Sequence, residues 1–301
     1  MRINSMDALL KTAESRGRKR VAVAAADDRV TLVAASEAAL RGISDPVLVG
    51  NREWITVISD KFRIPLESFD IINAKDTMEA SVIASDIVSS GGADILMKGN
   101  VPTSKFLQAA LGPAGGLKKG LLSDVEVYED DRGGASRLVL VSDGGIAIAP
   151  GIRQKLEIIR NAVVVAHRLG ISRPKVALLS GSEKVHPDFQ STIDAVALVK
   201  MCHDGAVEGC VVDGPFALDN AVDVEAARAK GIESPVAGSA DILIVPNLEA
   251  GNIFCKGLQF YGNKMLIHVA MGAKNPILID SRTASDREKL HSIALATLMC
   301  P

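Results

Sequence analysis

The sequence of 301 residues is poor in aromatic side chains, which make up only 3% of the chain. Its core must therefore be built from alanine, valine, leucine and isoleucine, a composition that suits buried parallel strands covered by helices. Hydrophobic residues at 48% and charged residues at 23% are ordinary for a globular protein. A chain of this length predicts two domains.

The chain also lacks a strong charge of either sign. Its formal net charge is −2, and no Lys/Arg run stands out beyond Arg18-Lys19-Arg20. Proteins that bind nucleic acid usually carry a basic patch or tail, so we predict no nucleic-acid partner. An anionic substrate would have to meet a local cluster of cations, because the whole protein supplies no attractive field.

Cysteines and long apolar runs are scarce. None of the four cysteines forms a Cys-x-x-Cys pair or lies at zinc-site spacing with a histidine, so we predict free thiols and no metal site. Residues 21–26 form an apolar run of about six, fewer than the roughly 7–15 of a signal sequence or the ~18 of a membrane span. The sequence therefore predicts a cytoplasmic protein without a membrane segment.

Several familiar catalytic motifs are missing. The chain has no G-x-x-x-x-G-K-[ST] and no G-x-G-x-x-G behind a strand, which argues against a nucleoside triphosphatase and a standard dinucleotide-binding protein. It also has no G-x-S-x-G and no H-E-x-x-H, which argues against a serine hydrolase and a zinc protease.

Short apolar runs alternate with amphipathic stretches along most of the chain. Strands are predicted at residues 21–26, 47–50, 69–73, 94–98, 175–180, 207–212, 241–246 and 276–280. The neighbouring runs 125–128 and 137–142 have only a glycine-containing turn between them and predict an antiparallel pair. The overall alternation of strand and helix predicts an α/β protein with doubly wound sheets.

The boundary between the two domains is predicted within the Gly/Pro-containing stretch 144–151, with a second crossing near residues 272–274. We therefore predict one α/β/α domain from residues 1–147 plus 273–301, and a second from residues 148–272. In such folds a ligand site lies at the carboxyl ends of the strands, here in the cleft between the domains.

One candidate anion site is the stretch Gly99–Ser104, which follows a predicted strand and opens a helix. Backbone N–H groups at a helix start bind anions, and the hydroxyls of Thr103 and Ser104 would add donors. Lys98 would supply positive charge. The simpler alternative is an ordinary helix cap by Thr or Ser.

Polar residues follow two other predicted strands. After the first, Asp143 precedes Gly144 and Gly145, which permit close backbone approach or a hinge; an ordinary turn is the alternative. After the second, Glu249 and Asn252 lie at a helix start, where α/β folds meet their substrates. Glu249 also favours a helix N-terminus for purely structural reasons.

Near the C-terminus, Ser281 and Arg282 follow the predicted strand 276–280. Arginine is the natural bidentate partner of phosphate, although a solvated loop arginine is an equal alternative. Ser285 and Glu288 match a capping box, and Asp286 would complement the helix dipole. Both acidic residues therefore have a structural interpretation beside a catalytic one.

Taken together, these segments resemble the phosphate acetyltransferase/phosphate butyryltransferase family, because their order and spacing agree along most of the chain. The matching strings are Lys98-Gly-Asn-Val-Pro-Thr-Ser104, Leu122-Ser-Asp124, Ser142-Asp-Gly-Gly-Ile-Ala-Ile-Ala-Pro150, Ile159-Arg-Asn-Ala-Val163, Val176-Ala-Leu-Leu-Ser180, Asp213-Gly-Pro-Phe-Ala-Leu-Asp-Asn-Ala221, Val236-Ala-Gly-Ser-Ala-Asp-Ile-Leu-Ile-Val-Pro246, Glu249-Ala-Gly-Asn252 and Ser281-Arg282.

The resemblance implies a two-domain fold like that of isopropylmalate dehydrogenase, without metal or nicotinamide cofactor. It implies an enzyme that forms acyl phosphate and CoA from acyl-CoA and inorganic phosphate, works as a homodimer and has its site in the interdomain cleft. The butyryl branch is favoured through Asp143-Gly-Gly and through Leu295-Ala296. Butyryl-CoA is therefore the expected substrate.

The resemblance also implies roles for single residues. The family's serine–arginine pair matches Ser281 and Arg282, and its acidic base falls nearest Glu288 by spacing, with Asp286 competing for the role. Where the acetyl branch has a cysteine after the aspartate, this chain has Gly144. The residues expected to bind substrate are Lys98, Asn100, Thr103, Ser104, Asp143, Gly144, Glu249 and Asn252.

Three other functions remain open at this point. The first is an acetyl-CoA-specific enzyme of the same family. The second is a metal-dependent decarboxylating dehydrogenase of similar fold, which would need Mg²⁺ ligands, and Asp213, Asp219 and Asp223 are its candidate cluster. The third is a non-catalytic acyl-CoA sensor, against which the retained Ser281, Arg282 and acidic pair argue.

Overall fold

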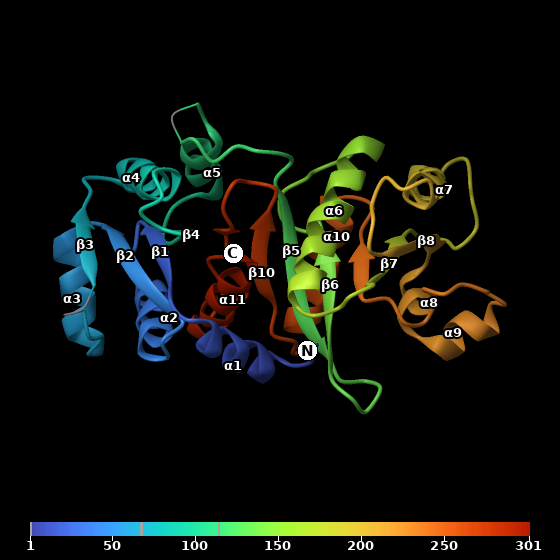
Figure 1. The fold of residues 1–301 in the computed structure, drawn as a ribbon, viewed down its shortest axis with the longest axis horizontal. Coiled ribbons are helices and arrows are strands. Elements are labelled where there is room, and N and C mark those ends of the chain that lie inside the picture. The colour runs from blue at the N-terminus through green and yellow to red at the C-terminus, as the bar shows by residue number, and fades with distance from the viewer. Residues whose placement is uncertain (1, 67–68, 114) are drawn as a thin grey trace. The chain divides into compact units, whose positions relative to one another are not determined.

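The structure is a computed structural model that describes residues 2–66, 69–113 and 115–301. The chain divides into two compact units. We call residues 6–120 with 267–301 the terminal unit, since it contains the C-terminus and most of the N-terminal region, and residues 1–5 with 121–266 the central unit. Each unit is a sheet covered by helices (Figure 1).

The sheet of the terminal unit has the strand order β3-β2-β1-β4-β11-β10. Neighbouring strands are parallel except β10, which runs antiparallel to β11. These strands are β1 (Lys19–Ala24), β2 (Ser44–Gly50), β3 (Asp70–Asn73), β4 (Ile95–Lys98), β10 (Ile267–Met271) and β11 (Ile277–Leu278). Because β1 and β4 are buried along most of their length, they read as continuous apolar runs in the sequence.

Helices lie on both sides of this sheet. In Figure 1, α4 (Thr77–Ser89) and α5 (Thr103–Leu111) lie above β1 and β4, and α1 (Met6–Arg16) and α2 (Arg29–Leu40) lie below. The C-terminal helix α11 (Asp286–Met299) packs against both α1 and α2, and α3 (Arg52–Phe62) packs against β3. Nearly every residue of α11 is buried, so it forms the centre of this layer.

The sheet of the central unit has the order β5-β6-β9-β7-β8. Its strands are β5 (Ser123–Asp130), β6 (Arg137–Ser142), β7 (Lys175–Leu179), β8 (Val211–Phe216) and β9 (Ile242–Ile244). The antiparallel pair predicted at 125–128 and 137–142 is present as β5 and β6, and the other pairs are parallel. The helices are α6 (Ile152–Arg168), α7 (Gln190–His203), α8 (Leu218–Val222), α9 (Val224–Ala229) and α10 (Leu248–Phe260).

The prediction of doubly wound α/β domains is confirmed, but the units divide the chain at other residues than the predicted boundaries. Residues 121–147 group with the central unit, because β6 pairs in parallel with β9. Residues 1–5 group there too, since Arg2 forms an ion pair with Asp241 at 2.7 Å. The chain returns to the terminal unit at residue 267 instead of 273, where β10 begins. None of the helices in the described part of the chain is long and apolar enough to cross a membrane.

Candidate active site

The loop from β4 to α5 follows the end of β1 closely. Lys98 is the last residue of β4, and the next two backbone N–H groups, of Gly99 and Asn100, donate to the carbonyls of Ala24 and Ala25 at 2.8 Å each. A Cβ on Gly99 would lie 2.2 Å from the Ala25 carbonyl oxygen, so only glycine fits there. The loop is thus fixed by the sheet before α5 begins.

The first turn of α5 is open to an anion. The N-cap residue is Pro102, which makes no side-chain capping bond, and α5 starts at Thr103. The alternative of a Thr or Ser cap is therefore not what the structure shows. The side chains of Asn100, Thr103 and Ser104 are exposed. Free N–H groups and hydroxyls together are the donors that an anionic substrate needs at a helix start.

The strand order brings Ser281 and Arg282 to the same edge of the sheet as this loop. β11 pairs in parallel with β4, with Leu278 opposite Met97, so the chain leaves both strands at the same end. Arg282 is exposed and takes part in no ion pair among the described residues. The Ser281 hydroxyl hydrogen-bonds the Thr283 hydroxyl at 3.0 Å. Strand pairing thus places Lys98 and Arg282, far apart in the sequence, at one edge.

Lys98 is a buried cation at this edge, with 2% of its surface exposed. Burial lowers the pKa of Lys98 to about 8, and the positive charges of Lys289 and Arg282 act in the same direction. The negative charges of Asp280 and Asp28 oppose them. Lys289, which is also buried, carries no motif and was missed by the sequence analysis; only its place on the buried face of α11 reveals it.

In the central unit, Asp143 organises the loop that follows β6. Its carboxylate accepts hydrogen bonds from the backbone N–H groups of Gly145 and Ile146 at 2.8 Å each and of Ala147 at 3.1 Å. Burial, together with the nearby charge of Asp124, raises the pKa of Asp143 to about 6, although the hydrogen bonds from Gly145 and Ile146 act in the opposite direction. Because three backbone N–H groups of one loop donate to this carboxylate, Asp143 holds the loop in its conformation.

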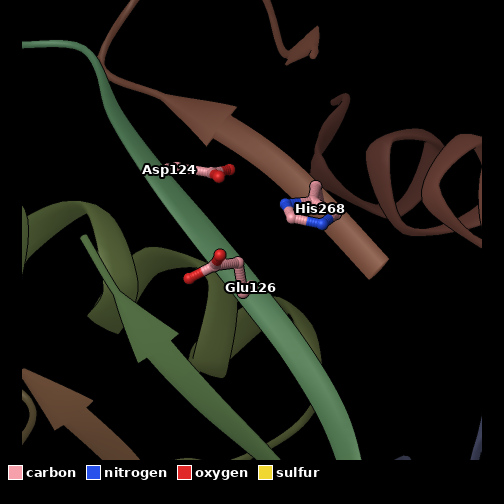
Figure 2. A group of neighbouring side chains, drawn as sticks. All are labelled: Asp124, Glu126 and His268. Carbon is pink, nitrogen blue, oxygen red and sulfur yellow. The ribbon is translucent and has the colours of Figure 1, made fainter. Parts of the chain in front are cut away.

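Gly144 and Gly145 lie close to two buried carboxylates on β5. Figure 2 shows Asp124 and Glu126, which lie two residues apart on the same face of that strand; His268, also drawn, is on β10 of the terminal unit. A Cβ on Gly144 would meet a Glu126 carboxylate oxygen at 2.5 Å, and one on Gly145 an Asp124 oxygen at 2.3 Å. The two glycines thus let the loop approach these carboxylates closely, and the Asp143 carboxylate closes a turn over the same residues.

The start of α10 packs on the same loop. Gly251 fits tightly against the Gly144 Cα, and the Asn252 side-chain amide reaches the Gly144 carbonyl at 3.4 Å. The N-cap of α10 is Asn247, whose side chain accepts a hydrogen bond from the Ala250 backbone N–H. The side chains of Glu249 and Asn252 are exposed. The central unit therefore brings Asp143, Gly144 and Asn252 together, with Glu249 on the outer side of the helix.

Residues 73–297 match the family described as "Phosphate acetyl/butaryl transferase". The chain belongs to this family. It is 41% identical to a phosphate butyryltransferase of Clostridium beijerinckii, over 98% of this chain and 97% of that one. It is 38% identical to a phosphate acetyltransferase of Thermotoga maritima, over 97% and 99% of the two chains. The crystal structure of a branched-chain phosphotransacylase from Enterococcus faecalis superposes with a TM-score of 0.81 at 28% identity, covering 94% of this chain and all of that one.

Membership of this family makes the chain an acyltransferase and removes support for the decarboxylating dehydrogenase. The structure also gives each aspartate of the dehydrogenase's candidate cluster another partner. Asp213 accepts from the Ser234 hydroxyl, Asp219 forms an ion pair with Lys230, and Asp223 caps α9. Within the described ranges these three do not form a group that could hold a metal ion.

Cys255, on α10, is not suited to act as a nucleophile. It is 4% exposed and its thiol donates to the Glu126 carboxylate at 3.1 Å. Burial and the Glu126 charge both raise the pKa of this thiol far above its usual range. Since the reactive form of cysteine is the thiolate, a thiol held in this state is inert.

The two acidic candidates for the base take different places on α11. Glu288 is 7% exposed and closes a capping box. Its carboxylate accepts a hydrogen bond from the Ser285 backbone N–H at 2.7 Å, and the Ser285 hydroxyl accepts one from the Glu288 backbone N–H at 3.2 Å. Asp286 lines a cavity of about 360 Å³ formed by α1, α2 and α11. The predicted capping box is confirmed, and the choice of base stays a prediction.

Exchanging Glu288 for glutamine separates the catalytic interpretation from the structural one. A glutamine also completes a capping box, so we expect the melting temperature of Glu288→Gln to stay nearly unchanged. If Glu288 accepts the thiol proton, turnover should fall by about 10²-fold or more, the scale of a lost general base. Steady-state kinetics and thermal unfolding measure both effects. Full activity in Glu288→Gln with a damaged Asp286→Asn would assign the base to Asp286.

Proposed function

We propose that the protein transfers the acyl group of a short-chain acyl-CoA, with butyryl-CoA favoured, to inorganic phosphate and so produces acyl phosphate and CoA. The observation that carries this proposal is the edge of the terminal unit where β4 and β11 end. There Lys98, Arg282 and the uncapped start of α5 offer charge and donors for anions. Family membership and the butyryltransferase relatives from two Clostridium species, 41% and 39% identical, support it.

The proposed chemistry needs only groups of this chain. A phosphate oxygen attacks the thioester carbonyl, and negative charge develops on the carbonyl oxygen before the C–S bond breaks. Arg282 and the Ser281 hydroxyl are proposed to stabilise that oxyanion, a role in which one donor contributes about 10²–10³ in rate. The phosphate O–H proton leaves as the C–O bond forms, and the sulfur leaves as thiolate and takes up one proton. In the reverse direction Glu288 or Asp286 would accept the thiol proton of CoA.

CoA and phosphate enter this scheme as substrates, and we propose no resident cofactor and no metal. The exposed Asn100, Thr103 and Ser104 are proposed contacts for a substrate held by the β4–α5 loop. Asp143, Gly144, Glu249 and Asn252 are proposed substrate contacts of the central unit. Asp143 fixes the loop that contains Gly144, and Asn252 contacts this loop from α10.

A homodimer and a cytoplasmic location belong to the same proposal. Exposed apolar side chains at the end of α10 support self-association: Phe260 is 65% and Tyr261 96% exposed. Aromatic side chains are enriched at protein interfaces relative to the rest of the surface. The free cysteines suit a reducing compartment. Sedimentation velocity measures the oligomeric state, and a monomer at micromolar concentration would rule out the dimer.

A thiol-release assay with four acyl-CoA substrates tests the activity. With acetyl-, propionyl-, butyryl- and isobutyryl-CoA, we expect CoA release that requires phosphate and persists in excess chelator. The four-carbon substrates should have higher kcat/KM than acetyl-CoA. Loss of activity in chelator with recovery in Mg²⁺ would contradict the mechanism. A clear preference for acetyl-CoA would leave the reaction standing and replace the butyryl assignment.

A further inference from the structure

Two buried lysines converge at the edge of the terminal unit where the candidate site lies. Lys98 ends β4, and Lys289 lies in the first turns of α11, with 2% and 4% of their surfaces exposed. One helical turn beyond Lys289, the Ser292 hydroxyl donates to Asp280 at 2.8 Å. This bond turns the face of α11 that carries Lys289 toward the end of β11, which lies beside β4.

The positive charges at this edge exceed the carboxylates able to balance them. In the described part of the chain neither lysine forms an ion pair, and the Lys98 ammonium reaches only the Gly99 carbonyl, at 3.4 Å. Asp280 is fully buried, with one carboxylate oxygen on Ser292 and the other without a hydrogen-bond partner. The Asp28 carboxylate caps α2.

A buried ammonium without a partner is costly, and two that repel each other are costlier still. Arg282 adds a third positive charge beside them. An anion bound from outside would offset this cost by pairing with the ammonium groups. The open first turn of α5 adds backbone donors at the same edge, and the oxygens of a phosphate dianion match such donors and ammonium groups.

We propose that Lys98 and Lys289 together form the subsite that binds the inorganic phosphate substrate, with Lys289 as a binding residue that the sequence motifs do not mark. This inference rests on the proposed function. Arg282, which is exposed, is left to meet the thioester carbonyl. In this proposal the two lysines bind phosphate, which is the nucleophile, and Arg282 binds the thioester carbonyl, which is the electrophile. Both anionic substrates are then held at the same edge of the sheet.

The subsite has a defined pH dependence. Lys289 and Arg282 are the positive groups that act on Lys98, and Asp280 and Asp28 the negative ones. With the pKa of Lys98 lowered to about 8, chiefly by burial, the free protein loses this charge as the pH rises through that value. Phosphate, which is already a dianion there, should bind more weakly above that pH. Removing Lys289 removes a like charge and should move this loss of affinity to higher pH.

Calorimetric titration of inorganic phosphate into the full chain, without acyl-CoA, tests the subsite. We expect Lys98→Met and Lys289→Met each to weaken phosphate binding by at least about 10-fold, the scale of a charge-assisted hydrogen bond. Lys11→Met, an exposed lysine of α1 with the same change of charge, is the control and should bind within about 2-fold of the parent protein. Lys289→Arg, which keeps the charge, should retain part of the affinity.

The melting temperature gives a second readout. Without phosphate, Lys289→Met should be at least as stable as the parent protein, because an unpaired buried ammonium is removed. Added phosphate should raise the melting temperature of Lys289→Met by less than it raises that of the parent protein. Parent-like phosphate affinity in Lys289→Met, or an unshifted pH dependence, would overturn the inference even if the enzyme releases CoA normally. Phosphate binding that depends on both lysines, without CoA release, would instead contradict the proposed function.

Discussion

Replacing Arg282 with alanine is expected to lower kcat by at least about 10²-fold, the scale of losing one preorganised donor to a developing oxyanion. Arg282 lies in the loop that follows β11, is exposed, and forms no ion pair within the described ranges. The protein should therefore melt at nearly the same temperature. Arg282→Lys keeps the charge but loses the planar fork, so it should recover only part of the rate.

Arg287→Ala is the matched control for Arg282→Ala. Arg287 is an exposed arginine in the first turn of α11 and lines the cavity formed with α1 and α2. We expect its kcat to remain within about 2- to 3-fold of the parent value, as for a surface substitution. Kinetics and thermal unfolding of both variants are compared side by side. If Arg282→Ala melts early and its activity follows only the folded fraction, Arg282 is structural and the mapping of the family's serine–arginine pair fails.

Gly99→Ala is expected to be the most destabilising single substitution in the candidate site, with a loss of at least about 4 kcal/mol in the free energy of unfolding, the exceptional end of the range for point mutants. The added Cβ would lie 2.2 Å from the Ala25 carbonyl oxygen and 2.8 Å from that of Ala24. Both are backbone atoms, and β1 is paired on both sides, so neither has room to move. The β4–α5 loop would have to detach, and activity should fall with it.

The control for Gly99→Ala is Gly257→Ala. Gly257 lies within α10, and a Cβ there would meet nothing within 4 Å. Alanine in a helix interior should stabilise by about 0.5–1 kcal/mol relative to glycine. Urea unfolding of both variants measures the contrast. A Gly99→Ala protein with the parent midpoint would show that the loop yields easily and that its glycine serves no structural purpose.

The sequence alone predicted those features that depend on neighbouring residues. Alternating apolar runs predicted the doubly wound units, because buried parallel strands repeat with covering helices between them. Residues 125–128 and 137–142 predicted the antiparallel pair of β5 and β6, and Ser285 with Glu288 predicted the capping box. The order of the motifs predicted the family, which the comparisons confirmed. It also marked the loops at the strand ends, whose roles stay predictions.

The tertiary structure decided whatever depends on strands and side chains that are distant in the chain. The pairing of β4 with β11 brings Lys98 beside Arg282, and the pairing of β6 with β9 assigns residues 121–147 to the central unit. Only the tertiary structure places Gly144 and Gly145 against the buried carboxylates on β5. Lys289 resembles any helical lysine until the packing of α11 buries it. Local periodicity specifies which segments become strands and helices. Burial and strand order arise only when those segments pack against one another, and this packing determines which charged side chains lie close together.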